Sequence, residues 1–173
     1  MRRVDELAIT VIGHDRPGIV ADVAGVLADL GANLTDSTMT RLRGHFAMTL
    51  ICTGPAAAEV EAALAPLAAD GQLLATVRAV RPDAIAAPEG EPHVLSVHGA
   101  DRLGIVAAVT RALAEAGGNI TDLTTRLAGP LYVLVAEVDL PPGSAEHTRA
   151  RLAEVAGDID VEVTLRRVES DVL

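Results

Sequence analysis

Aromatic residues are almost absent from this 173-residue chain, which has one Phe, one Tyr and no Trp. Half of its residues are hydrophobic, and these are mostly Ala, Val, Leu and Ile. A core of such aliphatic side chains suits a β-sheet packed against helices. The same scarcity argues against an RNA-recognition module, because such modules stack bases on aromatic residues of an open sheet face.

Cysteine and basic residues are scarce as well. Cys52 is the single cysteine, so no disulfide framework can form within the chain. The chain has 14 Lys and Arg residues against 24 Asp and Glu residues, which gives a formal net charge of −10. An acidic chain repels the phosphate backbone that nucleic-acid-binding proteins neutralise with basic side chains. We therefore expect no direct contact with DNA or RNA.

Other missing patterns narrow the function further. No apolar run reaches the ~18 residues that a membrane span needs, and no apolar segment follows the basic residues near the N-terminus. We expect a cytoplasmic protein without membrane contact. The five histidines have no zinc-ligand spacing with Cys or Glu, and no Gly-x-Ser-x-Gly motif or Walker loop is present. We expect no metal, no cofactor and no enzymatic activity.

The strongest positive signal is an internal repeat. Residues 13–21 (GHDRPGIVA) recur as residues 99–107 (GADRLGIVA), at an offset of 99 − 13 = 86 residues. Two copies are too few for a solenoid. The repeat therefore predicts two paralogous domains, at residues 1–81 and 92–173, joined by a proline-containing linker at residues 82–91.

Both copies show the same order of predicted elements. Hydrophobic periodicity and turn signals predict strands at 7–12, 33–43, 46–52 and 73–80, and again at 94–98, 119–127, 131–138 and 159–168. Helices are predicted from Asp15–Pro17 to Leu30, over 56–69 and 103–116, and after a Ser144 cap. This βαββαβ order is that of the ferredoxin-like fold, in which two helices lie on one face of a four-stranded antiparallel sheet. We assign an α+β class with two such tandem domains.

The other sheet face is left open in this fold. In the second copy we expect it to carry an apolar set, which the other copy or another chain would cover. This set is Tyr132, Leu134, Ala136 and Val138.

The strand-to-helix corner of each copy has the pattern Gly-x-Asp-Arg-x-Gly-Ile-Val. Glycine allows a sharp backbone turn and a close approach by a ligand. The helix start offers unpaired N–H groups and a partial positive charge that favour a carboxylate. An adjacent Asp can accept hydrogen bonds from an ammonium group, so Asp15 with Gly18, or Asp101 with Gly104, suits a free α-amino acid.

The same residues also fit structural roles. Asp15 and Asp101 are good helix N-caps, and Gly18 or Gly104 can permit close helix–strand packing. Arg16 and Arg102 are more often paired surface charges than ligand contacts. The asparagines that follow the helix-ending glycines, Asn33 and Asn119, suit turns. Cys52 shares its strand parity with Phe46, which indicates a buried thiol.

The segments DRPGIV (15–20) and GANL (31–34), together with DRLGIV (101–106) and GGNI (117–120), resemble the signature of ACT domains. The tandem arrangement and the length resemble the glycine cleavage system transcriptional repressor family. The resemblance implies that a ligand lies between the glycine loop of one domain and the second strand of a neighbour. The ligand-binding residues implied are Asp15, Arg16, Pro17, Gly18, Ile19, Asn33, Asp101, Arg102, Leu103, Gly104, Ile105 and Asn119.

The resemblance also implies an amino-acid ligand such as glycine, a homo-oligomer, and a protein partner that is a DNA-binding transcriptional activator. The second copy departs from the first at Ala100, Leu103 and Ala108, which replace His14, Pro17 and Asp22. These departures leave the loop glycine intact and argue against equal affinity of the two sites. The alternative function is a ligand-free structural or oligomerisation module within a larger complex.

Overall fold

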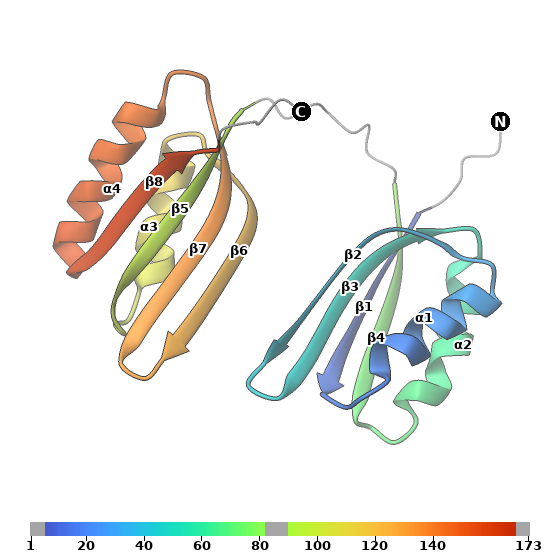
Figure 1. Ribbon diagram of the computed structural model, residues 1–173. Coiled ribbons are helices and arrows are strands. Elements are labelled where there is room, and N and C mark those ends of the chain that lie inside the picture. Colours follow the sequence, from blue (N-terminus) through green and yellow to red (C-terminus); the bar gives the residue numbers. More distant parts are fainter. Residues whose placement is uncertain (1–5, 82–89, 169–173) are drawn as a thin grey trace. The chain divides into compact units, whose positions relative to one another are not determined.

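The computed structural model describes residues 6–81 and 90–168, in two compact units, Met1–Ala84 and Ile85–Leu173 (Figure 1). The expected linker at 82–91 lies outside the described residues except for Gly90 and Glu91. Each unit has a four-stranded antiparallel sheet with two helices on one face, which confirms the predicted fold (Figure 1).

The first unit orders its strands β2-β3-β1-β4. Its elements are β1 (Glu6–His14), α1 (Ile19–Asp29), β2 (Asn33–Leu42), β3 (His45–Thr53), α2 (Ala57–Leu64), the 3-10 turn η1 (Ala65–Ala68) and β4 (Leu73–Val80). Pro66 explains why α2 gives way to η1, since proline cannot donate the helical hydrogen bond.

The second unit orders its strands β6-β7-β5-β8. Its elements are β5 (Glu91–Ala100), α3 (Ile105–Glu115), β6 (Asn119–Ala128), β7 (Leu131–Leu140), α4 (Ala145–Ile159) and β8 (Val161–Arg167). Strand β8 begins two residues later than predicted, because α4 continues to Ile159 and Asp160 ends it in a left-handed conformation.

The core of the first unit lies between the sheet and its helices. Ile19, Val23 and Leu27 recur every fourth residue along α1 and are at most 3% exposed. They pack with alternate residues of the strands, including Phe46 and Cys52, which are both fully buried. Fully burying one large aliphatic side chain stabilises a fold by roughly 1.5–3 kcal/mol.

The face predicted for strand β7 is wrong. Leu134, Ala136 and Val138 lie on the helix side, at most 1% exposed, and Tyr132 packs beside them. The open face carries the alternate residues Leu131, Val133, Val135 and Glu137. Both sets are largely apolar, so the sequence pattern did not distinguish them. Glu137 alone indicates that the outward residues of β7 are the exposed ones, because an unpaired carboxylate is costly to bury.

Both helices that follow the glycine corners begin later than predicted. The N-cap positions are Gly18 and Gly104, so Pro17 precedes the helix instead of lying in its first turn. Gly13, predicted to end the first strand, lies within β1.

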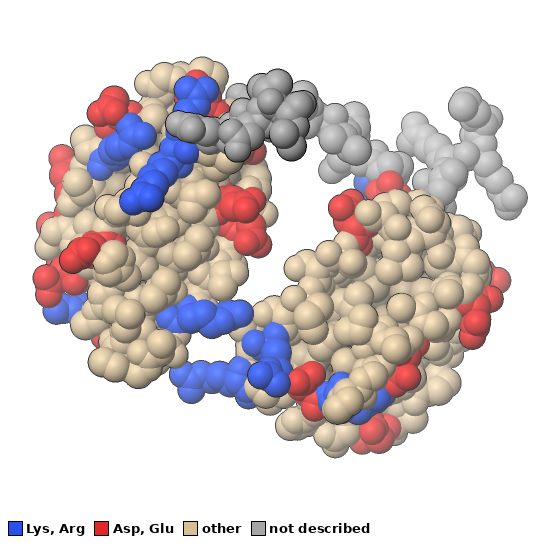
Figure 2. Space-filling model, in the orientation of Figure 1, with Lys and Arg blue, Asp and Glu red and all other residues tan. Residues whose placement is uncertain are grey.

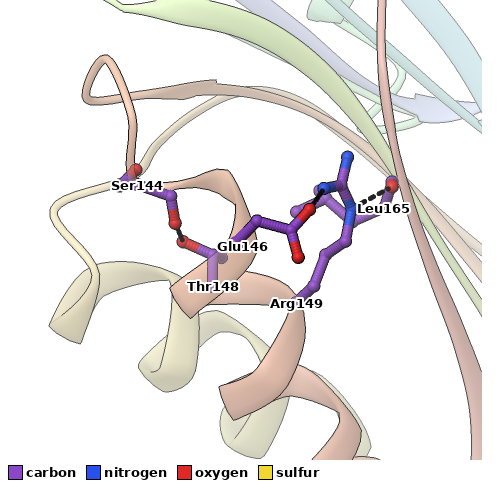
Figure 3. Close-up of polar contacts among 5 residues, drawn as sticks. All are labelled: Ser144, Glu146, Thr148, Arg149 and Leu165. Carbon is purple, nitrogen blue, oxygen red and sulfur yellow. Dashed lines mark hydrogen bonds and ion pairs between the residues drawn. The ribbon is translucent and has the colours of Figure 1, made fainter.

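Helix α4 is attached to its surroundings by polar contacts (Figure 3). Ser144 occupies its N-cap position, but its hydroxyl donates to the Pro141 carbonyl at 2.7 Å, so the predicted side-chain cap is wrong. The buried Thr148 hydroxyl donates to the Ser144 carbonyl at 2.9 Å. Arg149 Nε donates to the Leu165 carbonyl at 3.2 Å, which ties α4 to β8 (Figure 3).

Acidic and basic side chains are interspersed on the faces drawn in Figure 2, with wide uncharged areas between them. Within residues 6–81 and 90–168, no helix has both the length and the apolar character needed to cross a membrane.

Candidate ligand-binding site

The strand-to-helix corner of each unit is shaped by a left-handed glycine. The φ angle is 84° at Gly18 and 88° at Gly104. Residues with a Cβ are disfavoured in this conformation by about 1–2 kcal/mol. A Cβ added to either glycine would meet no atom within 4 Å, so close helix–strand packing does not explain them. The corner is open to solvent in its own unit.

The close-packing role belongs to the glycines that precede these corners. A Cβ on Gly13 would lie 2.0 Å from the backbone oxygen of Gln72. On Gly99, the counterpart of Gly13 in the repeat, a Cβ would lie 3.0 Å from Val161 Cγ1. These glycines let β1 and β5 approach the neighbouring strands closely beside each corner.

The helix starts present free amide hydrogens. The first helical bond of α1 runs from the Asp22 N–H to the Gly18 carbonyl, at 2.9 Å. The amides of the three residues between them therefore have no acceptor within the helix. In α3 the first such bond runs from Ala108 to Gly104, also at 2.9 Å. Neither helix has a side-chain cap, so both termini can accept an anion.

Asp15 and Asp101 are not helix caps, which corrects that structural alternative. The Asp15 carboxylate lies 3.4 Å from Arg41 NH1, and its side chain is 31% exposed. An ion pair this long and this exposed contributes at most about 1 kcal/mol. The backbone N–H of Asp15 donates to Gly44, and that of Asp101 to Pro130, which fixes both loops to the following hairpin.

The loop arginines, Arg16 and Arg102, form ion pairs with different partners in the two units. Arg16 pairs with Asp22 of α1 at 2.7 Å. Arg102 cannot copy this pair, because Ala108 replaces the aspartate, and it pairs instead with Asp160 at 2.6 Å. Both pairs are exposed to solvent. Either arginine can therefore exchange its carboxylate for that of a ligand at a small cost.

The two buried isoleucines have a restricted role. Ile19 is 3% and Ile105 is 2% exposed, since both side chains belong to the cores of their units. Only their backbone amides can reach a ligand. Leu103, which stands where the first unit has Pro17, is fully exposed.

The asparagines lie at the opposite end of their sheets from the glycine loops. Asn33 pairs in register with Thr53, which also pairs with Glu6 at the start of β1, whereas the loop follows His14 at its end. Asn119 pairs with Asp139 near the end of β7, whereas Ala100, next to the second loop, pairs with Leu131 at the start of β7. Asp15 and Asn33 of one unit therefore cannot contact one small ligand together.

A shallow hollow of about 510 Å³ lies beside the second corner. It is lined by His98, Gly99, Ala100, Pro130, Leu131, Asp160, Val161 and Glu162. It reaches the motif at Ala100, the residue before Asp101. Two of its lining residues, His98 and Glu162, lie 2.8 Å apart at Nε2 and Oε2. In the first unit His14 contacts the ring of His45 edge-on, with centroids 5.3 Å apart. His14 and His98 therefore lie beside the first and second glycine corner, respectively.

Sequence reasoning missed the residues that hold the loops. After a one-residue deletion in the second copy, Arg41 corresponds to Arg126 in the repeat, and this recurrence is a signal for a role near Asp15. Asp160 gave no such signal, because it lies 58 positions from Arg102. Among the described residues, no group of three or more His, Cys, Asp or Glu side chains could hold a metal ion.

Comparison with known proteins identifies both units. Family models described as ACT domain match residues 5–78 and 93–157. A UPF0237 protein of Methanopyrus kandleri is 54% identical over 43 residues, which are 25% of this chain and 48% of that protein. A UPF0237 protein of Listeria monocytogenes is 46% identical over 44 residues, or 25% and 49% of the two chains. This chain thus matches about half the length of these curated relatives.

Solved structures extend the likeness over nearly the whole chain. An unknown protein from Galdieria sulphuraria has a TM-score of 0.81 and 29% identity, and the match covers 96% of this chain and 99% of that one. A candidate glycine cleavage system transcriptional repressor has a TM-score of 0.75 at 19% identity with the same coverage, which shows a shared fold. With one ACT domain matched in each unit, the chain belongs to the ACT domain family.

Proposed function

We propose that this protein senses a small amino acid, glycine or a similar one, and regulates gene expression or an enzyme through a protein partner. The observation that carries the proposal is the uncapped helix start behind a left-handed glycine, with an aspartate beside it, in both units. Membership of the ACT domain family supports a regulatory role.

The geometry suits a zwitterion. The ligand carboxylate would accept hydrogen bonds from the free amides that follow Gly18, where the helix dipole adds favourable charge. The ligand ammonium would pair with Asp15, displacing the long contact with Arg41. The second corner offers the same groups through Gly104 and Asp101.

Because Asn33 lies at the far end of its own sheet, its amide would reach a ligand only from a neighbouring ACT domain. Its side chain is exposed at the start of an edge strand, and Asn119 is placed alike. An amide offers both a donor and an acceptor to the ligand. This placement supports a site that a second ACT domain completes, and in a homo-oligomer that domain would come from another copy of the chain.

The regulated component would be a protein in the cytoplasm. The net charge of −10 disfavours direct binding to nucleic acid. Both aromatic side chains also lie on the helix side of their sheets, where Phe46 is fully buried, so neither can stack a base on the open face. A transcriptional activator is the partner implied by the resemblance of the sequence to the glycine cleavage system transcriptional repressor family.

Isothermal titration with glycine, serine and a panel of other amino acids tests the proposal. We expect a dissociation constant below about 1 mM, which corresponds to about −4 kcal/mol. Asp15→Asn and Asp101→Asn should each weaken binding about tenfold, because a charged hydrogen bond to the ammonium is lost. Glu61→Gln, which removes an exposed charge on α2, is the matched control and should leave binding unchanged.

Lack of binding across the panel would favour the alternative of a ligand-free structural module. Unchanged affinity in both aspartate variants would move the site away from the two corners.

A further inference from the structure

The open face of the first sheet is crossed by a row of four threonines, one from each strand. Thr38 lies opposite Thr49, Thr49 opposite Thr10, and Thr10 opposite Thr76. The hydroxyl oxygens of Thr10 and Thr49 are 3.4 Å apart. β-branched residues in register give a firm, uncharged surface without large protrusions.

The two flanking rows differ from each other. One contains Thr40, Ala47, Ile12 and Leu74, of which Ile12 is 46% and Leu74 is 60% exposed. The other contains Asp36, Ile51, Ala8 and Arg78. The face is thus apolar at one end of the strands. At the other end it carries Glu6 on β1, two residues beyond Ala8, and one charge of each sign on its outer strands, Asp36 and Arg78.

These two charges lie at opposite edges of the sheet. Asp36 is on β2 and Arg78 is on β4, three strand spacings apart, or about 14 Å. They are therefore too distant to pair with each other. The ion pairs found within residues 6–81 include neither of them.

We propose that this face binds the same face of a second copy of the chain, with the two-fold axis parallel to the strands. That axis places β2 of one copy over β4 of the other. Asp36 then meets Arg78 of the other copy, twice in the dimer, while the threonine rows and the apolar rows cover each other. Two sheets packed face to face keep their strands within about 30° of parallel, as this arrangement requires.

The other aligned arrangement has its two-fold axis across the strands, and it is disfavoured by charge. It would place Arg78 against Leu74 and Asp36 against Thr40, and so bury both charges without partners. Charge complementarity therefore selects one axis.

The open face of the second sheet is a less favourable partner for the open face of the first sheet. Its corresponding row is Asp122, Glu137, Val94 and Arg166. Glu137 lies on β7, an inner strand, where the first sheet has Ile51. Any flat partner would cover this carboxylate, and neither face places a cation opposite it. On the first face the inner strands carry no charge in the three rows described, and Glu6 lies beyond them at the start of β1, so burial of this face has the lower electrostatic cost.

The size of the face predicts a weak dimer. Four strands about 4.8 Å apart, with some seven residues each rising about 3.4 Å, give roughly 450 Å² on each copy. The total of about 900 Å² is just below the ~1,000 Å² expected of a stable interface. We expect dissociation constants in the micromolar range or weaker.

A charge-swap experiment on the full chain, without added amino acid, tests the proposal by sedimentation equilibrium from 1 µM to 1 mM. Asp36→Arg and Arg78→Asp should each raise the dimer dissociation constant at least tenfold, because like charges then face each other twice. The double variant Asp36→Arg/Arg78→Asp should restore the wild-type constant. Asp122→Arg is the matched control on the second sheet and should have no effect.

Thr10→Arg provides a test that does not depend on charge pairing, because it places a long side chain at the centre of the face. It should abolish the dimer while the circular dichroism spectrum stays unchanged. A wild-type chain that is monomeric at 1 mM would overturn the proposal, as would a dimer insensitive to Thr10→Arg. Rescue of Asp36→Arg by Arg166→Asp instead of Arg78→Asp would assign the face to the second sheet and also overturn it. The substituted residues lie outside the two glycine corners, and amino-acid binding is tested separately by the titrations.

Discussion

Arg102 lies 2.6 Å from Asp160, at the end of α4, whereas its counterpart Arg16 lies 2.7 Å from Asp22 in the first turn of α1. The arginine of the motif therefore pairs with a residue of the following helix in the first unit and with a residue at the end of α4 in the second. The acidic residue in the first turn of α1 is absent from α3, where Ala108 replaces it. The two corners share their glycine geometry but not their electrostatic surroundings.

This difference predicts two classes of ligand site. In Asp22→Ala, Arg16 loses its partner and can pair with the ligand carboxylate instead, so the first site should bind about two- to fivefold more tightly. An exposed ion pair contributes at most about 1 kcal/mol, which sets this limit. Titration calorimetry should show one dissociation constant falling while the other stays constant. Equal changes in both constants would contradict separate sites.

Substitutions at Gly18 and Gly25 should have opposite effects on stability. Gly18→Ala forces a Cβ into a conformation with φ of 84° and should lower the free energy of unfolding by about 1–2 kcal/mol. Gly25→Ala lies in the middle of α1, where an added Cβ meets nothing within 4 Å, and should raise it by about 0.5–1 kcal/mol. Urea denaturation followed by circular dichroism measures both. A stabilised Gly18→Ala would show that this corner relaxes to another conformation.

Gly13→Ala should destabilise the first unit more than Gly99→Ala destabilises the second. At Gly13 the new Cβ would lie 2.0 Å from a backbone oxygen, which cannot move without displacing β4. At Gly99 the new Cβ would lie 3.0 Å from Val161 Cγ1 and 3.2 Å from the Val161 Cα, so a shift of a few tenths of an ångström would be enough. We expect a loss of about 3 kcal/mol or less for Gly13→Ala, and under about 1 kcal/mol for Gly99→Ala. Thermal unfolding of the two variants would show the reverse order if the close approach of β1 and β4 is not maintained in solution.

Burial raises the pKa of the Cys52 thiol above its ordinary value of 9.0. The folded state therefore favours the neutral thiol. Its contribution to stability is present below pH 9.0 and is lost as the pH rises towards the folded-state pKa, because the unfolded chain ionises first. The free energy of unfolding should fall more steeply above pH 9.0 in the wild type than in Cys52→Ala.

Native protein should also react slowly with a thiol reagent at pH 8 and rapidly in urea, because the thiolate is the reactive form. Parallel pH profiles of the wild type and Cys52→Ala, or fast labelling of the native state, would contradict a buried neutral thiol.

Much of the fold could be predicted from the repeat and from local periodicity. The order of strands and helices along each copy and the helix on either side of the hairpin follow from short-range patterns that the structure confirms. The helix predicted over 56–69 ends at Leu64, and the 3-10 turn that contains Pro66 takes the place of its last turn. The buried face of α1 can also be predicted from the sequence, because Ile19, Val23 and Leu27 recur at helical spacing.

Two predictions fail because each depends on a single position or a single strand. Aspartate favours the N-cap of a helix, but Gly18 occupies the N-cap of α1 in a left-handed conformation that residue spacing does not reveal. Strand β7 is apolar on both faces, so alternation could not show that Leu134 faces the helices while Val135 faces outward.

The sequence by itself determined that the chain repeats one βαββαβ module and that each copy carries glycine and aspartate at the same corner. These features depend on residues that are close together in the chain, so their spacing and backbone preferences can be inferred from the sequence directly. Only the tertiary structure decided that Asp15 faces Arg41, that Arg102 is held by Asp160, and that four threonines align across one open face. Such contacts join residues far apart in the chain, so strand register and helix packing, not local preference, set which of them meet.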